Sequence, residues 1–320
     1  MTDLLVVGAG TMGRGIAQVA AAAGYTVHLV DATAELADAG RARIAAGLHD
    51  GVHRGKLSES DRAATLARIH PSVDLAAAAA GIAVAIEAVP ERLELKREVF
   101  AHLERDAPAS ALLASNTSSL SITELQRGLR SPERVLGLHF FNPVPVSPLV
   151  EVVRGADTGE HAIARGLELV ARLSKQAVVV KDSPGFATSR LGVLLGLEAM
   201  RMVEEGVASV ADIDRAMELG YRHPMGPLRL SDLVGLDVRL DIARELYRKL
   251  GREQFRPPAI LERLVAEGRL GRKTGAGFYD WPDAVPEPAA VLEARTPRRG
   301  GRALDAPPGG PSGPFSPEPA

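Results

Sequence analysis

The chain has 320 residues, a length typical of about two domains with a sizeable buried core. Its 38 Lys and Arg side chains nearly balance 40 Asp and Glu side chains, and the net charge of −2 gives no global electrostatic reason to bind nucleic acid or an acidic membrane surface. Cysteine is absent, which excludes disulfides, thiol catalysis and thiolate metal sites, and we expect no metal centre.

The two ends of the chain carry different signals. The first three residues lack the positive charge of a secretory signal, and no apolar run reaches the ~18–20 residues of a membrane span. We therefore expect a cytoplasmic protein without a membrane partner. Residues 282–320 contain 10 Pro and 5 Gly in 39 positions, so they cannot bury enough apolar surface to offset the entropy of ordering. This segment is predicted to be a disordered tail.

The predicted elements begin with a βαβ unit. Residues 4–7 form a short apolar run that ends at Gly8, which is typical of a fully buried strand. Residues 11–23 follow as a helix rich in Ala and Gly, and residues 27–30 form a second apolar strand closed by Asp31. Strand, turn, helix and strand within about 30 residues predict two parallel strands joined by a helix.

Alternating strands and helices continue to about residue 181, after which only helices are predicted. Apolar runs predict strands at residues 82–87, 112–114, 135–140, 149–153 and 177–180. Helical spacing predicts helices at residues 34–47, 58–68, 92–103, 122–126 and 162–173, and then at residues 191–203, 210–217, 240–250 and 260–267. The short Ala-rich patch at residues 76–85, interrupted by Gly81, predicts a small helix that leads into a buried strand. The predicted fold class is therefore α/β, with a Rossmann-like dinucleotide-binding domain over residues 1–183 and an all-helical C-terminal domain over residues 184–281.

A glycine-rich turn joins the first strand to the first helix, where the sequence reads Gly-Ala-Gly-Thr-Met-Gly. In this context Gly8 allows a tight turn, Gly10 lets the backbone approach a pyrophosphate, and Gly13 lets the helix pack on the strand. Thr11 and Met12 open the helix, whose N-terminal N–H groups attract phosphates. The pattern predicts a dinucleotide site, and the alternative is a glycine-rich turn without a ligand.

An acidic residue helps to choose between the two dinucleotides. Asp31 ends the second predicted strand, 18 residues after the last glycine of the turn. A carboxylate at this point accepts hydrogen bonds from the hydroxyl groups of an adenine ribose. It would repel the 2′-phosphate of NADP, so the sequence favours NAD as the cofactor.

A histidine of one predicted strand is expected to meet a glutamate of the next. His139 and Glu151 each lie six residues from position 145, and two prolines within residues 144–148 require a turn there. Folding the segment at this turn makes the two residues cross-strand neighbours, with Cβ atoms ~5 Å apart. A carboxylate beside an imidazole fixes its tautomer and raises its basicity, so the pair predicts a general base. A purely structural hydrogen bond is the alternative.

A cluster of hydroxyl side chains follows the predicted strand at residues 112–114. Residues 115–119 read Ser-Asn-Thr-Ser-Ser, and ligands of doubly wound folds bind beyond the carboxyl ends of strands. The alternative role is to cap the next helix, for which Ser121 and Glu124 form a capping box. Both roles hold if Ser121 caps and Ser118 remains free to bond a substrate oxygen.

Several stretches together resemble the L-3-hydroxyacyl-CoA dehydrogenase family, in the style of its short-chain 3-hydroxybutyryl-CoA dehydrogenases. The resemblance spans residues 3–281, and the stretch at residues 137–145 with that at residues 149–152 is its most specific part. The matching stretches are VGAGTMG (7–13), ASNTSSL (114–120), GLHFFNPVP (137–145), LVEV (149–152), KDSPGF (181–186), HPMGP (223–227), GRKTG (271–275) and GFY (277–279).

The resemblance implies a reversible hydride transfer between NAD and carbon 3 of a 3-hydroxyacyl-CoA. It makes His139 the base that takes the hydroxyl proton, and Glu151 the group that orients His139 and stabilises the imidazolium. It gives Ser118 and Asn142 hydrogen bonds to the reacting oxygens or to the nicotinamide side of the cofactor.

Other side chains match binding positions of the family. Glu91, Lys96 and, more weakly, Lys273 match cofactor-contacting positions, although each has an alternative explanation as a solvated surface charge. Lys56 falls in the CoA-binding region, where a basic side chain meets phosphates. Ser189 stands where the family usually has a substrate-site asparagine, so we expect an altered acyl preference or rate with the chemistry retained.

The resemblance also implies a homodimer, because the family pairs two subunits through the helical domain. The apolar residues Leu191, Leu194, Leu195 and Val203 fit such an interface, and equally an internal core. Two other functions remain open from the sequence. One is an NAD-dependent dehydrogenase of a free 3-hydroxy acid of the sugar-acid or carnitine type, and the other is a non-catalytic NAD-binding protein, which Ser189 keeps open.

Overall fold

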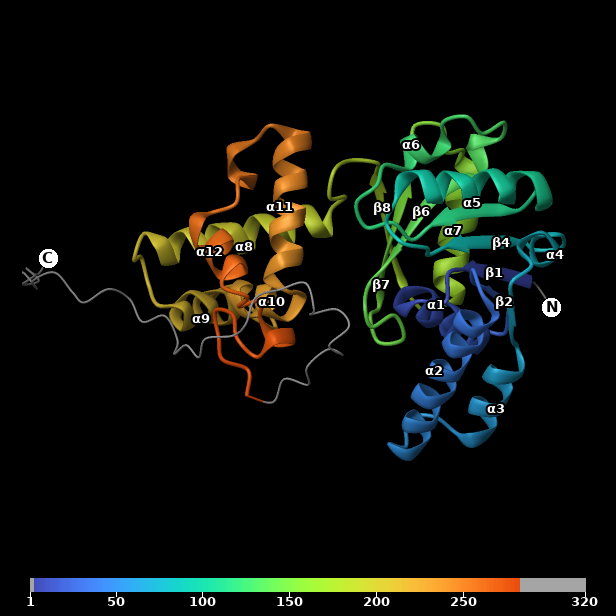
Figure 1. The fold of residues 1–320 in the computed structure, drawn as a ribbon, viewed down its shortest axis with the longest axis horizontal. Coiled ribbons are helices and arrows are strands. Elements are labelled where there is room, and N and C mark those ends of the chain that lie inside the picture. Colours follow the sequence, from blue (N-terminus) through green and yellow to red (C-terminus); the bar gives the residue numbers. More distant parts are fainter. Residues whose placement is uncertain (1–2, 283–320) are drawn as a thin grey trace, which may run out of the picture. The chain divides into compact units, whose positions relative to one another are not determined.

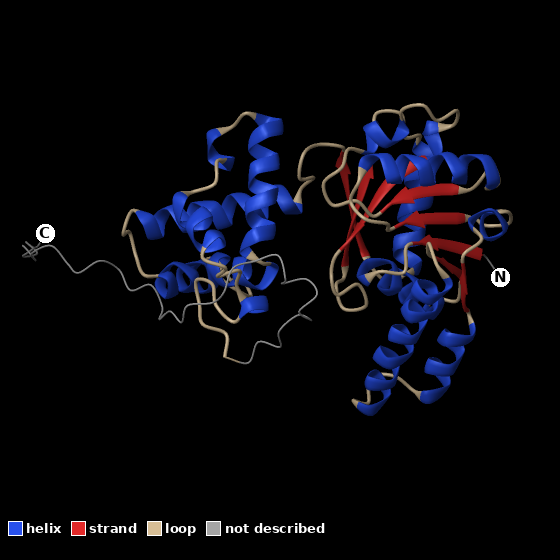
Figure 2. Cartoon of the chain, in the orientation of Figure 1, coloured by secondary structure: helices blue, strands red, loops and turns tan. Residues whose placement is uncertain are grey.

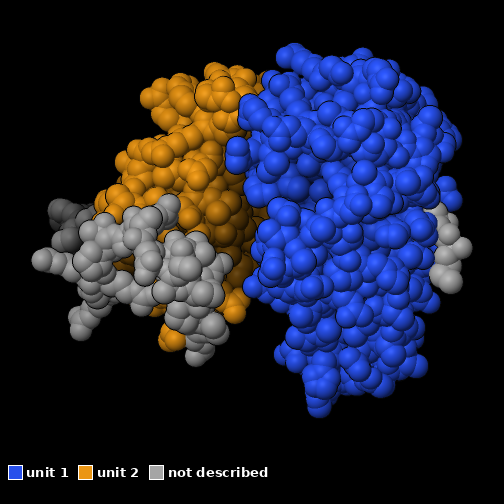
Figure 3. All heavy atoms as spheres, turned by 45° about the vertical axis from the view of Figure 1, so that its right-hand side comes forward, with its two compact units in different colours: residues 1–187 blue, residues 188–320 orange. Residues whose placement is uncertain are grey.

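The computed structural model describes residues 3–282, which form two compact units that divide after Ala187 (Figure 3). This division lies close to the point where the sequence changes from alternating strands and helices to helices alone. Except for Pro282, the tail predicted at residues 282–320 lies outside the described residues. Within residues 3–282, no helix is both long enough and apolar enough to span a membrane.

The first unit is built on one eight-stranded sheet (Figures 1 and 2). Its strand order is β3-β2-β1-β4-β5-β6-β7-β8, and every neighbouring pair is parallel except β6 and β7. The strands are β1 (Asp3–Val7), β2 (Thr26–Val30), β3 (Ile69–Ser72), β4 (Val84–Glu87), β5 (Leu112–Ser115), β6 (Val135–Phe140), β7 (Leu149–Arg154) and β8 (Gln176–Lys181). The carboxyl ends of the first six strands therefore share one edge of the sheet, where doubly wound folds bind their ligands.

Helices cover both faces of this sheet (Figure 2), as predicted for an α/β fold. Successive residues of a strand face opposite sides, so Leu4 and Val6 enter one hydrophobic core while Leu5 and Val7 enter the other. The first core is shared with α1 (Thr11–Ala22), α2 (Ala34–His53) and α7 (Glu160–Arg172). The second core is shared with α4 (Leu75–Ala79), α5 (Leu93–Asp106) and α6 (Ile122–Gln126). A further helix, α3 (Glu59–Ala67), packs against α2.

The second unit is helical around a core of its own. Its helices are α8 (Thr188–Glu204), α9 (Val210–Gly220), α10 (Pro227–Val234), α11 (Leu236–Leu250) and α12 (Ala259–Ala266). The apolar stripe expected on α8 divides between two environments. Leu191 and Leu195 are 61% and 42% exposed, whereas Leu194 and Val203 pack against the core of this unit.

A fully buried carboxylate fastens the end of the second unit. Asp232 accepts hydrogen bonds from the backbone N–H groups of Phe278 and Tyr279, both at 2.9 Å, and from Nε1 of Trp281 at 3.0 Å. Burial raises the pKa of Asp232 above its usual value, and the three hydrogen bonds oppose that rise. Because these donors come from the last described residues, Asp232 holds that segment onto α10.

Two elements were not predicted from the sequence. The strand β3 contains Pro71, and it is accommodated because β3 lies at the edge of the sheet, where a missing N–H breaks no ladder. The helix α10 begins at Pro227, and the first free N–H groups after it, those of Leu228 and Arg229, donate to the carboxylate of Asp214, each at 2.8 Å. This cap comes from a different helix, so no local sequence pattern announces it. The other predicted elements are present, although α2 continues to residue 53.

Candidate active site

The glycine-rich turn between β1 and α1 has the geometry that a bound pyrophosphate requires. Gly8 has φ +102°, and a Cβ there would lie 2.7 Å from the carbonyl oxygen of Ala88. A Cβ on Gly13 would collide with the carbonyl oxygen of Gly8, so the helix packs this closely only with glycine. The structural roles predicted for Gly8 in the turn and for Gly13 in helix packing are confirmed. Among residues 3–282, a Cβ built on Gly10 would meet no atom beyond its chain neighbours within 4 Å, and no side chain caps the first N–H groups of α1.

Asp31 at the end of β2 is bonded to the same turn. Its Oδ2 accepts a hydrogen bond from the backbone N–H of Ala9 at 2.6 Å, and its Oδ1 accepts from Ala32 at 2.7 Å. The carboxylate therefore fixes the turn beside it. Each oxygen has a second lone pair, so Asp31 keeps the capacity to accept from ribose hydroxyls.

The predicted pairing of His139 with Glu151 is confirmed. The antiparallel register of β6 and β7 places the two residues directly opposite each other, and His139 Nδ1 lies 2.8 Å from Glu151 Oε2. A carboxylate accepts but does not donate, so Nδ1 carries a proton, and in the neutral imidazole Nε2 then keeps its lone pair. The imidazole is thus in the tautomer that a general base needs.

The surroundings of this pair hold the imidazole in place. Glu151 is fully buried, and its Oε1 accepts from the backbone N–H of Ala187 at 3.1 Å. The ring centroids of Phe141 and Phe186 lie 4.4 and 5.8 Å from that of His139, which itself is 6% exposed. A carboxylate in an apolar strand needs partners of this kind to offset its desolvation.

A cavity of about 330 Å³ opens beside His139 at the carboxyl edge of the sheet. Five of the residues that the sequence singled out for cofactor or substrate meet here beside His139, and they are Met12, Glu91, Lys96, Ser118 and Asn142. The residues that line it are Met12, Ala88, Val89, Glu91, Lys96, Asn116, Ser118, His139, Phe140, Phe141 and Asn142. The cavity therefore joins the glycine-rich turn to the histidine in one site.

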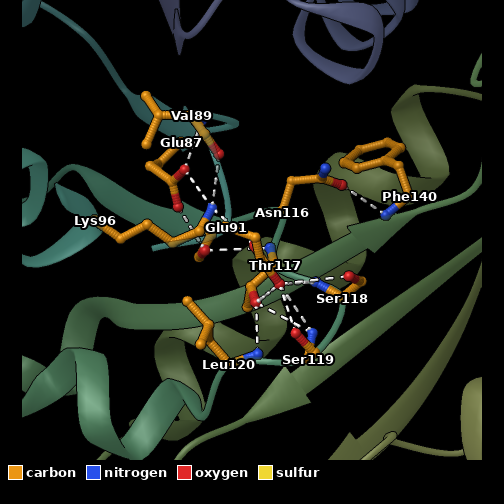
Figure 4. A network of polar contacts seen from close by, with 11 residues as sticks. Glu87, Val89, Glu91, Lys96, Asn116, Thr117, Ser118, Ser119, Leu120 and Phe140 are labelled. Atoms are coloured by element: carbon orange, nitrogen blue, oxygen red, sulfur yellow. Dashed lines mark hydrogen bonds and ion pairs between the residues drawn. The ribbon is translucent and has the colours of Figure 1, made fainter. Parts of the chain in front are cut away.

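One wall of this cavity is a buried ionic network (Figure 4). Lys96 is 1% exposed, and its Nζ lies 2.6 Å from Oε1 of Glu87 and 3.2 Å from Oε2 of Glu91. Glu87, at the end of β4, also accepts from the hydroxyl of Ser115 at 2.6 Å and from the backbone N–H of Val89 at 2.7 Å. The alternative of a solvated surface charge is therefore wrong for Lys96.

Glu91 organises the loop that follows β5. Its Oε1 accepts from the hydroxyl of Thr117 at 2.6 Å and from the backbone N–H groups of Ser118 and Ser119 at 2.9 and 3.0 Å. The hydroxyl of Ser118 lies 3.4 Å from the same oxygen. Ser118 does not cap the helix, as predicted, but its backbone and its hydroxyl both contact Glu91, and its role at the substrate stays a prediction. The predicted cap is present, since Ser121 accepts from the backbone N–H of Glu124 at 3.1 Å.

The two carboxylates of this network have pKa values shifted in opposite directions. Burial raises the pKa of Glu87, against the opposing effects of Lys96 and its hydrogen bonds. Burial also acts to raise the pKa of Glu91, but the Lys96 ammonium and the hydrogen bonds from the loop outweigh it, so the pKa of Glu91 is lowered. Glu91 therefore stays ionised beside the cavity. Sequence reasoning missed Glu87, whose signal is an acid that ends a buried strand, as Asp31 does.

Three of the predicted binding residues lie away from this cavity or in the other unit. Lys56 is exposed in the turn between α2 and α3, where it lines a groove of about 520 Å³ in the first unit. Lys273 belongs to the second unit, where its Nζ lies 2.6 Å from Asp237 Oδ1. Ser189 lies in the first turn of α8. The roles expected of these three residues stay predictions. Among residues 3–282, no group of three or more His, Asp or Glu side chains is arranged to hold a metal ion.

The model of the 3-hydroxyacyl-CoA dehydrogenase NAD-binding domain matches residues 3–183, and that of the 3-hydroxyacyl-CoA dehydrogenase C-terminal domain matches residues 185–281. These matches adjoin near the point where the structure divides. They cover both the cavity with its glycine-rich turn and the helical unit.

Individual relatives match over almost the same span. The 3-hydroxybutyryl-CoA dehydrogenase of Mycobacterium tuberculosis is 46% identical over 278 residues, which cover 86% of this chain and 97% of the relative. The 3-hydroxyadipyl-CoA dehydrogenase of Escherichia coli is 44% identical over 290 residues, which cover 90% of this chain and 61% of the relative. The crystal structure of (S)-3-hydroxybutyryl-CoA dehydrogenase PaaH1 from Ralstonia eutropha matches with a TM-score of 0.84 at 39% identity, covering 88% of this chain and 100% of that chain. The chain therefore belongs to the 3-hydroxyacyl-CoA dehydrogenase family.

Proposed function

We propose that this NAD-dependent dehydrogenase oxidises the 3-hydroxyl group of a short-chain (S)-3-hydroxyacyl-CoA, or runs the reverse reduction, with His139 as the general base. The observation that carries the proposal is the position of the His139–Glu151 pair. The pair is buried, its hydrogen bond uses Nδ1 and leaves Nε2 to the substrate, and it lies on the wall of the cavity that Met12 of the glycine-rich turn also lines.

The residues present fit the cofactor. The open space over Gly10, the uncapped start of α1 and the carboxylate of Asp31 together provide room, N–H donors and ribose acceptors. Glu91 and Lys96 would hold the nicotinamide end, because both line the cavity that contains His139. When bound, NAD supplies the acceptor for a hydride.

The side chains then divide the proton chemistry among themselves. In the oxidation, the hydride leaves carbon 3 and the hydroxyl proton moves to Nε2 of His139, so the C–O single bond becomes a carbonyl. Glu151 stabilises the imidazolium across the 2.8 Å hydrogen bond and returns to the same geometry when the proton leaves. Ser118 and Asn142 line the cavity and bond the reacting oxygens or the nicotinamide side.

The remaining binding roles follow from position and charge. Lys56 meets the CoA phosphates together with Arg54 of the same groove, because the net charge of −2 provides no global attraction for them. Ser189, a shorter side chain than asparagine with one hydroxyl, alters the acyl preference. Two subunits pair through the helical unit, and Leu191 and Leu195 are exposed for that contact. The enzyme works in the cytoplasm.

The test is NADH formation with (S)-3-hydroxybutyryl-CoA, longer (S)-3-hydroxyacyl-CoAs and free 3-hydroxybutyrate. The wild type is expected to turn over the thioesters far faster than the free acid. His139→Ala is expected to lower kcat ~10²–10⁴-fold through loss of the base. His161→Ala, which removes an exposed histidine of α7, is the matched control and should leave kcat unchanged.

Three results would contradict the proposal. Retained activity in His139→Ala would remove the histidine from the mechanism. Equal turnover of the free acid would favour a free 3-hydroxy acid as the substrate. Binding of NADH without turnover of any substrate would identify a non-catalytic NAD-binding protein.

A further inference from the structure

The strands β5 and β6 separate at the base of the cavity. Their parallel pairing ends with Ser115 opposite Gly137, yet β6 continues for three more residues to Phe140. Beyond that point β6 pairs only with β7, through His139 opposite Glu151 and Phe140 opposite Val150. His139 therefore lies on a part of β6 that has lost backbone pairing on the β5 side.

A side chain replaces the missing backbone pairing. Oδ1 of Asn116, the first residue after β5, accepts a hydrogen bond from the backbone N–H of Phe140 at 2.9 Å (Figure 4). The backbone N–H of Asn116 donates to the carbonyl oxygen of Glu87 at 2.8 Å. Asn116 is thus fixed to β4 by its backbone and to β6 by its side chain, next to the catalytic histidine.

The orientation of this carboxamide is set by its partner. A backbone N–H only donates, so the oxygen of Asn116 must face Phe140 and Nδ2 must point elsewhere. Asn116 lines the cavity together with Ser118, His139 and Asn142. Among residues 3–282, no group accepts a hydrogen bond from Nδ2 of Asn116. Polar groups in such half-buried places find an acceptor when the site is filled.

We infer that Asn116 donates a hydrogen bond from Nδ2 to the oxygen on carbon 3 of the substrate while its Oδ1 positions the β6 segment that carries His139. This inference rests on the proposed function. As the hydroxyl proton leaves for His139 and the hydride leaves carbon 3, negative charge develops on that oxygen before the carbonyl is complete. A fixed amide donor stabilises this charge and does not compete for the proton, because a carboxamide does not titrate.

Two substitutions separate the donor from the positioning contact. Asn116→Asp keeps an oxygen for the Phe140 N–H and removes both N–H donors, whereas Asn116→Ala removes the donor and the contact together. Both variants are expected to lower kcat with (S)-3-hydroxybutyryl-CoA about 10²-fold, the usual cost of one such donor. The Kd for NADH, followed by NADH fluorescence, should change by less than about threefold in each variant.

The melting temperature and the pH dependence of kcat/KM distinguish a hydrogen bond to the substrate from a merely structural role of Asn116. Asn116→Ala should melt below the wild type and Asn116→Asp close to it, because only the second variant keeps the contact to β6. In Asn116→Ala the pH of half-maximal kcat/KM should match the wild type, since His139 and Glu151 remain paired. A displaced imidazole would shift that profile together with kcat.

Each failure has its own pattern. If Asn116→Asp retains kcat while Asn116→Ala loses it, Asn116 only positions β6, and the proposed hydrogen bond from Nδ2 to the substrate oxygen is refuted. If the Kd for NADH weakens and saturating NAD restores kcat, the donor faces the cofactor and the assignment to the substrate is overturned. If both variants are as active as the wild type while His139→Ala is inactive, this inference fails and the proposed function stands. If His139→Ala is also active, the proposed mechanism fails.

Discussion

Completely buried carboxylates occur in both units of the molecule, and Glu151 of the first unit and Asp232 of the second are used differently. In the first unit, Glu151 accepts from the imidazole of His139 as well as from the backbone N–H of Ala187. In the second unit, Asp232 accepts from two backbone N–H groups and from the indole of Trp281. Complete burial therefore does not distinguish a carboxylate proposed to act in catalysis from a structural one. The difference lies in the partner, because Glu151 bonds a titratable side chain beside a cavity, whereas Asp232 bonds groups of a segment that it holds in place.

The substitution with the largest expected effect, Glu151→Gln, tests whether Glu151 differs in role from Asp232. We expect kcat to fall about 10²–10⁴-fold, because the amide can present a donor to Nδ1, which disfavours the tautomer with a free Nε2 and no longer stabilises the imidazolium. Glu160→Gln, at an exposed glutamate that pairs with Arg154, is the control and should keep full activity. Steady-state NADH formation measures both. A Glu151→Gln enzyme with wild-type kcat would mean that Glu151 is as structural as Asp232.

The second substitution tests the other carboxylate. Asp232→Ala is expected to lower the free energy of unfolding by about 3–5 kcal/mol, because three buried donors lose their acceptor. The chain has one tryptophan, Trp281, and it lies at this site, so its fluorescence during urea denaturation follows the second unit directly. Asp241→Ala, at an exposed aspartate of α11, is the matched control. An unchanged transition in Asp232→Ala would contradict a fastening role.

The smallest effect is expected at Glu91, which bonds both Lys96 and the loop after β5. The pKa of Glu91 in the folded chain lies below its usual value of 4.5, so its stabilising contribution is complete above pH 4.5 and is lost as the pH falls through the folded value. The stability gap between the wild type and Glu91→Gln should therefore be larger at neutral pH than in acid. Urea denaturation at a series of pH values measures this difference in the free energy of unfolding. A difference that grows in acid would contradict a lowered pKa of Glu91.

The features that were predictable from the sequence are local ones. The βαβ unit and the pairing of His139 with Glu151 depend on spacing within a few tens of residues, and a turn near position 145 sets the register of the two strands. Gly13 was predictable because its contact with the carbonyl oxygen of Gly8 lies within one turn, and Gly8 was predictable because the turn requires its positive φ. In these cases the spacing of residues along the chain also determines which residues meet in the folded structure, so a sequence pattern indicates the contact.

The features that were not predictable depend on contacts between different elements that no turn or periodic pattern in the sequence aligns. Lys96 looks like a surface residue of an amphipathic helix, and only the end of β4 supplies the carboxylate of Glu87 that keeps it buried. The cap of α10 comes from Asp214 in α9, and the partner of Ser118 is Glu91, 27 residues earlier. Asn116 belonged to a recognised cluster, but its contact to Phe140 follows from the separation of two strands, which no spacing reveals.

The hairpin of β6 and β7 has a consequence for how the proposed catalytic pair is assembled. It carries both members of the pair only 12 residues apart, so closing the loop between them costs little entropy. The contact of Gly8 with Ala88, by contrast, joins segments that lie far apart in the chain. Under the proposed function, one short hairpin carries the groups that move the proton, while the acyl group and the nucleotide are met by other segments. Ser189 lies outside this hairpin, so its proposed effect is on what is bound and leaves the proton transfer as it was.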